Sequence, residues 1–184
     1  MKTTVINLFA GPGAGKSTVA SEVYSSLKRQ GKDVELVREY VKDWVWEGKK
    51  IGKYDQPYIF GKQSHAESRL YGKVKYIVTD SPFFLSPFYE QVTFGTKITL
   101  EAAKLFMRYA MANDVSYFNF FLPRQGKYIS KGRLQTSRKA KELDRKLFAF
   151  LDGLDIPLFT VNSSLDERAE EILAILQVME RTPR

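Results

Sequence analysis

Residues 10–17 have the residue types and the spacing of a phosphate-binding loop. Their sequence is Ala10-Gly11-Pro12-Gly13-Ala14-Gly15-Lys16-Ser17. The pattern of such loops is matched at every position but the first, where Ala10 replaces a glycine. Small residues let successive backbone N–H groups turn inward around a phosphate, and a helix that begins near Ser17 points the positive end of its dipole at the same anion. The segment therefore predicts binding of a nucleoside triphosphate.

Two side chains of this loop have defined tasks. Lys16 is long enough to reach the β- and γ-phosphates, and the hydroxyl of Ser17 is a ligand for Mg²⁺. Lys16 is therefore a candidate catalytic residue, and Ser17 is a candidate metal ligand. We expect the nucleotide to contact Gly11, Gly13, Ala14, Gly15, Lys16, Ser17 and Thr18.

Two acidic residues follow segments that have the composition of buried strands. Asp80 would hold Mg²⁺ through water or accept the proton of an acceptor hydroxyl, which makes it a candidate catalytic, substrate-binding and metal-binding residue. Its alternative role is to cap the turn that continues into Ser81. Glu39 would accept hydrogen bonds from a sugar hydroxyl, with Arg38 beside it in the substrate site. Alternatively, Glu39 and Arg38 pair with each other at the surface.

Positive charge is concentrated in residues 124–146. The chain has a formal net charge of +8, and this segment, with nine basic and two acidic residues, contributes +7 of it. Its bases are Arg124, Lys127, Lys131, Arg133, Arg138, Lys139, Lys141, Arg145 and Lys146. Such a segment attracts polyanions, and its place after a strand suits a flexible lid over approximately residues 124–140. Arg124 and Arg133 are candidate catalytic residues that would neutralise a transferring phosphoryl group. The alternative is a solvated charged surface.

Short apolar segments alternate with segments of helical periodicity along the chain. We expect strands at residues 4–10, 34–37, 74–79, 115–122 and 158–161, and helices at residues 17–30, 56–71, 100–112, 136–151 and 165–180. This alternation is typical of βαβ units and of a mainly parallel, doubly wound sheet. Ligands of such sheets bind beyond the carboxyl ends of the strands, which is where the loop, Glu39 and Asp80 all fall.

The composition excludes several classes of protein. The chain has 184 residues, no cysteine and one histidine, His65. Without cysteine there is no disulfide scaffold, thiolate metal site or cysteine nucleophile, and one histidine does not make a multi-histidine metal site. No apolar run approaches the roughly 20 residues that a membrane span needs. We expect one domain over residues 1–184, in a cytoplasmic protein with no membrane partner, or in the host cytoplasm if it comes from a phage.

Three classes of triphosphate-binding protein compete. A GTPase usually reads guanine with an Asn-Lys-x-Asp stretch, which this chain lacks. A motor-type ATPase typically follows its strand-end aspartate with a glutamate that activates water, whereas Asp80 is followed by Ser81 and Pro82. Both absences favour a kinase, which needs a carboxylate near the acceptor hydroxyl and mobile positive charge. A regulatory nucleotide-binding ATPase without an acceptor stays open as an alternative.

The chain resembles the P-loop kinases of nucleosides and nucleotides, in particular the ribosylnicotinamide kinase domain and related phage ATPase/kinase proteins. The resemblance rests on Gly11–Thr18, Arg38-Glu39-Tyr40-Val41, the strand ending at Asp80, Asp114, Gly132-Arg133 and a helix beginning near Asp144-Arg145. It implies a three-layer P-loop kinase-type fold with a mainly parallel five-stranded sheet, and ATP-dependent phosphorylation of a hydroxyl. It places Lys16, Ser17 and Asp80 at the phosphates and Glu39 near the acceptor. The turn after Asp80 departs from the ribosylnicotinamide kinase pattern and is closer to that of nucleoside and nucleotide monophosphate kinases.

Two kinds of acceptor remain open. The first is a small nucleoside or nucleotide enclosed by an aromatic-rich region, and the second is a hydroxymethylated pyrimidine in DNA, as in the phage DNA kinases. The rings concerned are Trp44, Trp46, Tyr54, Tyr58, Phe60, Phe83, Phe84, Phe88, Tyr89 and Phe94. They would stack on a base or fill the core. The basic residues 124–146 favour DNA as a partner, but a lid over a small substrate accounts for the same charge, and we expect the small acceptor.

Overall fold

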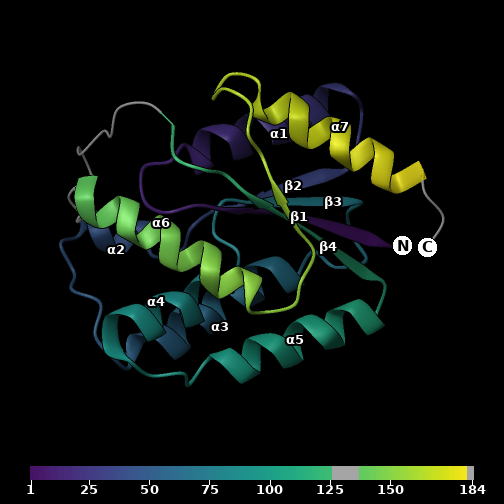
Figure 1. Ribbon diagram of the computed structural model, residues 1–184. Coiled ribbons are helices and arrows are strands. Elements are labelled where there is room, and N and C mark those ends of the chain that lie inside the picture. Colours follow the sequence, from purple (N-terminus) through teal and green to yellow (C-terminus); the bar gives the residue numbers. More distant parts are fainter. Residues whose placement is uncertain (126–136, 182–184) are drawn as a thin grey trace.

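The centre of the fold is a parallel sheet of five strands (Figure 1). The computed structural model describes residues 1–125 and 137–181. In spatial order, the strands are β2 (Val34–Val37), β3 (Tyr76–Thr79), β1 (Thr3–Phe9), β4 (Val115–Phe121) and β5 (Leu158–Thr160). All four pairings are parallel, which confirms the sheet predicted from the alternation of strands and helices.

Strand β1 lies in the middle of the sheet because both of its faces are apolar. All seven of its residues are buried, as expected for a parallel strand that is covered by helices on both sides. Ile6 and Leu8 belong to one core and Val5 and Phe9 to the other, in the two-residue alternation of a strand. The strand therefore carries the segment that follows it, residues 10–17, to the carboxyl edge of the sheet.

Helices cover the two faces of the sheet and make a three-layer structure (Figure 1). One face packs against α1 (Lys16–Arg29) and α7 (Arg168–Arg181). The other packs against α4 (Leu85–Phe94), α5 (Leu100–Ala112) and α6 (Ser137–Asp152). Helix α3 (Asp55–Ser68) lies against α4, and the short α2 (Lys42–Trp46) contributes no buried residue. None of the helices in the described part combines the length and the apolar character needed to span a bilayer.

Two of these helices, α2 and α4, were absent from the sequence prediction. Helix α4 has Pro87 as its third residue, where a missing N–H costs no intrahelical hydrogen bond. Pro82 and Pro87 give this stretch the composition of a turn, although the helix begins between them. Helix α2 has five residues, which is too short to display a helical period. The predicted helix over residues 56–71 ends at Ser68, and the third strand begins at Tyr76.

A carboxyl group is buried between α3 and the sheet. Glu67 is 1% exposed, and the hydroxyl of Tyr71 donates to its Oε1 at 2.5 Å. The hydroxyl oxygens of Tyr71 and Tyr117 lie 2.6 Å apart. Burial, which disfavours the ionised form, raises the pKa of Glu67 to about 7.

This buried carboxyl predicts a pH dependence of stability. Because the folded-state pKa of Glu67 is about 7 against 4.5 for an unperturbed glutamate, the folded protein binds more protons between these values. The free energy of unfolding should therefore fall by roughly 3 kcal/mol as the pH rises from about 4.5 to about 7, and should then level off.

Glu67→Gln should lose this component of the pH dependence, as measured by urea unfolding at pH 5 and pH 8. Glu170→Gln, an exposed substitution on α7, is the control and should keep it. A Glu67→Gln protein with the pH dependence of the parent would contradict the assignment.

Candidate active site

The loop that joins β1 to α1 has a backbone that only glycine adopts readily at two positions. Gly13 has φ 74° and Gly15 has φ 91°, both in the left-handed region. A Cβ atom on Gly15 would also lie 2.7 Å from Cδ1 of Leu165, in the segment that precedes α7. The two glycines thus allow the chain to turn sharply and α1 to begin at Lys16, directly after the loop. Gly15 is the N-cap residue of α1, so the helix N-terminus and the loop form one continuous feature.

The side chain of Lys16 folds back onto the phosphate loop. Its Nζ donates to the backbone oxygens of Ala10 at 2.8 Å and Gly11 at 3.2 Å. The ammonium group is therefore already held at the position of the loop. Ser17 and Thr18, at the first turn of α1, are exposed to solvent.

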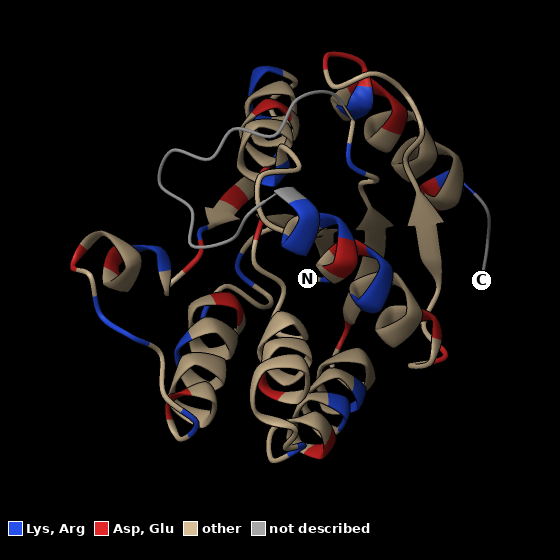
Figure 2. Cartoon of the chain, turned by 60° about the vertical axis from the view of Figure 1, so that its left-hand side comes forward, with Lys and Arg blue, Asp and Glu red and all other residues tan. Residues whose placement is uncertain are grey.

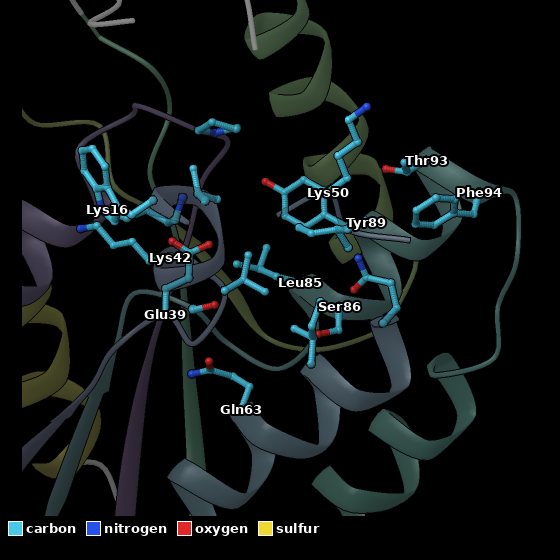
Figure 3. Close-up of a pocket in the computed structure, with 18 residues that line it drawn as sticks. Lys16, Glu39, Lys42, Lys50, Gln63, Leu85, Ser86, Tyr89, Thr93 and Phe94 are labelled. Carbon is cyan, nitrogen blue, oxygen red and sulfur yellow. The ribbon is translucent and has the colours of Figure 1, made fainter. Parts of the chain in front are cut away.

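A pocket of about 620 Å³ opens beside the loop (Figure 3). This volume lies within the range of small-molecule sites. Lys16 and Pro12 of the loop, Glu39 after β2 and Ser81 after β3 contribute to its wall. The remaining lining comes from α2 with the residues on either side of it, from α3 and from α4, namely Val41, Lys42, Val45, Trp46, Lys50, Ile51, Gln56, Ile59, Gln63, Leu85, Ser86, Tyr89, Thr93 and Phe94. Two helices that the sequence did not predict therefore form much of the pocket.

Asp80 is a buried carboxylate at the end of β3. It is 7% exposed, and its Oδ1 has no hydrogen-bond partner among the described residues. The N–H of Ser81 donates to Oγ1 of Thr79, so the turn that follows β3 is closed by Thr79 and not by Asp80. An unsatisfied buried carboxylate oxygen is costly unless a cation or a donor completes it.

The residues present fit a magnesium ion that is shared with a nucleotide. No group of three or more acidic, histidine or cysteine side chains in the described part is arranged to hold a metal by itself. Mg²⁺ is commonly held by one or two protein oxygen ligands together with phosphates and water. The Ser17 hydroxyl and the Asp80 carboxylate are protein oxygens of this kind.

An ion pair from distant segments lies on the phosphate loop. Arg124 donates from Nε to Oδ2 of Asp144 at 2.8 Å, and from Nη2 to the oxygen of Pro12 at 2.7 Å. Asp144 Oδ1 accepts the N–H of Gly11 at 2.9 Å, and a Cβ atom on Gly11 would lie 2.0 Å from that oxygen. Both charged side chains are nearly buried. Arg124 therefore contacts the loop, and Asp144 is a contact that spacing did not indicate.

Arg168 also contacts the phosphate loop. It is 1% exposed, and it donates to the backbone oxygens of Ala14 at 3.2 Å, of Ser163 at 3.4 Å and of Pro123. Desolvation lowers the pKa of its guanidinium. These bonds tie the loop to the end of β4 and to the segment after β5. Sequence reasoning missed Arg168, because one arginine at the start of an amphipathic helix carries no signal of burial.

The other predicted site residues have different outcomes. Arg38 is exposed and absent from the pocket wall, and its backbone oxygen accepts from Gln63.

Arg133 and most of the predicted lid lie outside the described residues, and residues 137–140 form the first turn of α6. Figure 2 shows basic residues in blue on that part of α6, beside the ion pair of Lys146 with Glu142. Gln125 donates to the backbone oxygens of Asn162 and Ser163, in the segment after β5.

Comparisons with known proteins agree with this architecture. The protein family described as AAA domain matches residues 5–168. No curated protein matches the sequence. A deoxyadenosine kinase from M. mycoides, solved with products, has a TM-score of 0.63 at 18% identity, and the match covers 95% of this chain and 99% of that one. An APS kinase from Mycobacterium tuberculosis, in complex with AMPPNP and APS, has a TM-score of 0.53 at 16% identity, with coverages of 96% and 98%. The α/β fold is thus of the P-loop kinase type.

The role of Arg168 can be tested by substitution. Arg168→Met should lower the free energy of unfolding by about 3 kcal/mol, because three backbone oxygens lose a charged donor. It should also weaken nucleotide binding, since Ala14 belongs to the loop. Urea unfolding and calorimetry with ATP and Mg²⁺ measure the two effects. Arg181→Met, at the exposed end of α7, is the matched control and should change neither. Parent-like ATP affinity in Arg168→Met would show that the loop does not need this tether.

Proposed function

The chain belongs to the AAA domain family over residues 5–168, and from this premise we propose that it is an ATP-dependent phosphotransferase. The reaction would move the γ-phosphoryl group of ATP to a hydroxyl of a small nucleoside or nucleotide. One observation carries the proposal, which is that Lys16 of the phosphate loop and Glu39 line the same pocket. A site for hydrolysis alone would not need an enclosed volume for a second molecule beside the loop.

The phosphate loop would bind the triphosphate. The backbone N–H groups of Gly13, Ala14 and Gly15, together with the N-terminus of α1, would supply donors and a positive partial charge. Lys16 would exchange the backbone oxygens of Ala10 and Gly11 for the β- and γ-phosphates. Because these two backbone bonds already hold the ammonium at the loop, little movement is needed.

In the phosphoryl transfer, one bond to the γ-phosphorus forms as another breaks, and residues of the pocket and of the loop would assist. The acceptor hydroxyl oxygen forms a bond to the γ-phosphorus, the bond between that phosphorus and the bridging oxygen of ADP breaks, and ADP leaves. Glu39 is the carboxylate of the pocket that would accept the hydroxyl proton. Arg124, which lies on the loop beside Pro12, would stabilise the negative charge of the transferring group.

Asp80 and Ser17 would hold Mg²⁺, which neutralises phosphate oxygens when bound. Asp80 is absent from the pocket wall, whereas Ser81 is part of it. This arrangement favours Asp80 for the metal and Glu39 for the acceptor hydroxyl, out of the two roles considered for Asp80 from the sequence.

A nucleoside-type acceptor is supported by an unused amide in the pocket wall. Gln56 is 5% exposed and lines the pocket, and its side chain forms no hydrogen bond within the described part of the chain. A side-chain amide offers a donor and an acceptor side by side, which matches the edge of a nucleobase. Trp46, Tyr89 and Phe94 supply aromatic surface in the same pocket. The similar APS kinase and deoxyadenosine kinase structures, whose names describe kinases of nucleotide and nucleoside substrates, agree with this acceptor class.

Loss of Lys16 should separate chemistry from folding. Lys16→Ala should abolish transfer of label from γ-labelled ATP to any acceptor, because no other loop side chain reaches the β- and γ-phosphates. Its melting temperature should stay within a few degrees of the parent, since the side chain is half-exposed. Release of inorganic phosphate alone by the parent protein, with every nucleoside and nucleotide offered, would favour a regulatory ATPase and overturn the proposal.

Two carboxylates should give different kinetic signatures. Glu39→Gln should lower kcat about 100-fold with unchanged ATP affinity, because it removes the base that receives the hydroxyl proton. Asp80→Asn should lower kcat and also the affinity for Mg²⁺, measured by titrating the metal at fixed ATP. Glu47→Gln is a control, because Glu47 is exposed and pairs with Lys49 away from the pocket wall. If Glu39→Gln kept full activity, the acceptor would not lie where we place it.

A further inference from the structure

The acceptor pocket is more basic than a neutral substrate requires. Within the described part of the chain, its wall contains three lysines, Lys16, Lys42 and Lys50, and one acidic residue, Glu39. Lys16 belongs to the phosphate loop and is accounted for by ATP. Two positive charges therefore remain in the wall for the second molecule.

Neither Lys42 nor Lys50 is neutralised by the protein. Each ion pair found among the described residues involves other lysines or arginines, and neither residue has a hydrogen-bond acceptor there. The lysines next to Lys50 differ in this respect, because Lys49 lies over the ring of Trp44 and Lys53 over the ring of Tyr54. Lys50 instead contributes to the pocket wall.

The two charges lie at different ends of the pocket. Figure 3 shows Lys42 on the left of the view with Lys16 and Glu39, and Lys50 right of centre beside Tyr89. A separation seen in projection is a lower bound on the true separation. The pocket is therefore charged near Lys16 and Glu39, where the phosphoryl group would be transferred. Lys50 adds a positive charge away from that point.

We propose that the acceptor carries an anionic group of the phosphate type at the end opposite to its reacting hydroxyl, and that Lys50 binds this group. The inference rests on the proposed function and narrows its substrate class from a nucleoside or nucleotide to a phosphate-bearing nucleotide. The hydroxyl lies at Glu39, the base lies between the apolar walls within reach of Gln56, and the phosphate lies at Lys50. The product would then carry phosphoryl groups at both ends.

The experiment compares a nucleoside with the same nucleoside bearing a 5′- or a 3′-phosphate, first by calorimetry without ATP and then by transfer from γ-labelled ATP. The matching phosphorylated form should bind at least about 10-fold more tightly than the nucleoside, as a charge-assisted contact provides. Lys50→Gln should raise its Kd and KM about 10-fold and change kcat less than twofold. The same variant should leave the nucleoside unaffected. Lys53→Gln is the matched control and should behave as the parent.

The outcomes separate this inference from the proposed function. Equal affinity for the nucleoside and for both phosphorylated forms, or an equal loss for all of them in Lys50→Gln, would overturn the role of Lys50. Nucleotide binding that depends on Lys50 without any transfer of label would keep the anion site and overturn the kinase.

The phosphate could also belong to a nucleic acid strand, so a short single-stranded oligonucleotide forms a further arm of the experiment. Tighter binding of the oligonucleotide than of both mononucleotides, again reduced by Lys50→Gln, would support the anion site and assign its phosphate to a strand.

Discussion

The backbone conformation of residues 10–17 is the constraint on which the rest of the site depends. A loop that binds an anion with main-chain groups needs contacts from other segments to keep those groups in place. Asp144 binds the N–H of Gly11, Arg124 binds the oxygen of Pro12, and Arg168 binds the oxygen of Ala14. These partners come from α6, from the end of β4 and from α7. The loop is thus fixed by contacts that span 133, 112 and 154 residues of sequence.

The sheet explains how such distant groups meet. Strands β3 and β4 flank β1 and run parallel to it, so the segments after all three strands reach the same edge. Asp80 follows β3, Arg124 lies just beyond β4, and the loop follows β1. Glu39 comes from the segment after β2, which pairs with β3. Each of these residues is close to the phosphate loop or to its pocket because of strand order, and not because of sequence proximity.

Strand order also explains which parts of the site could be predicted from the sequence. The loop and the carboxylates at strand ends are local patterns, because a strand followed by small or acidic residues is visible in a short stretch. Asp144 and Arg168 have no such pattern, since their partners are main-chain groups far away in the sequence. The pocket could not be predicted because two helices that form much of it, α2 and α4, have no clear sequence pattern. Pro87 is tolerated within the first turn of α4 although proline usually breaks helices, and α2 is shorter than two helical turns.

The buried ion pair on the loop has a cost that its position explains. Removing two charges from water is unfavourable, and an apolar pair of the same size is often as stable. Arg124 and Asp144 nevertheless gain from the loop itself, because each also bonds its main chain. The pair thus fixes the main chain of the loop and keeps the guanidinium of Arg124 next to Pro12. Lys16 adds a second positive side chain at the loop, and Oδ1 of Asp80 has no hydrogen-bond partner among the described residues. In the proposed function, oriented main-chain dipoles of this fixed loop would therefore act on the phosphates together with these two cationic side chains.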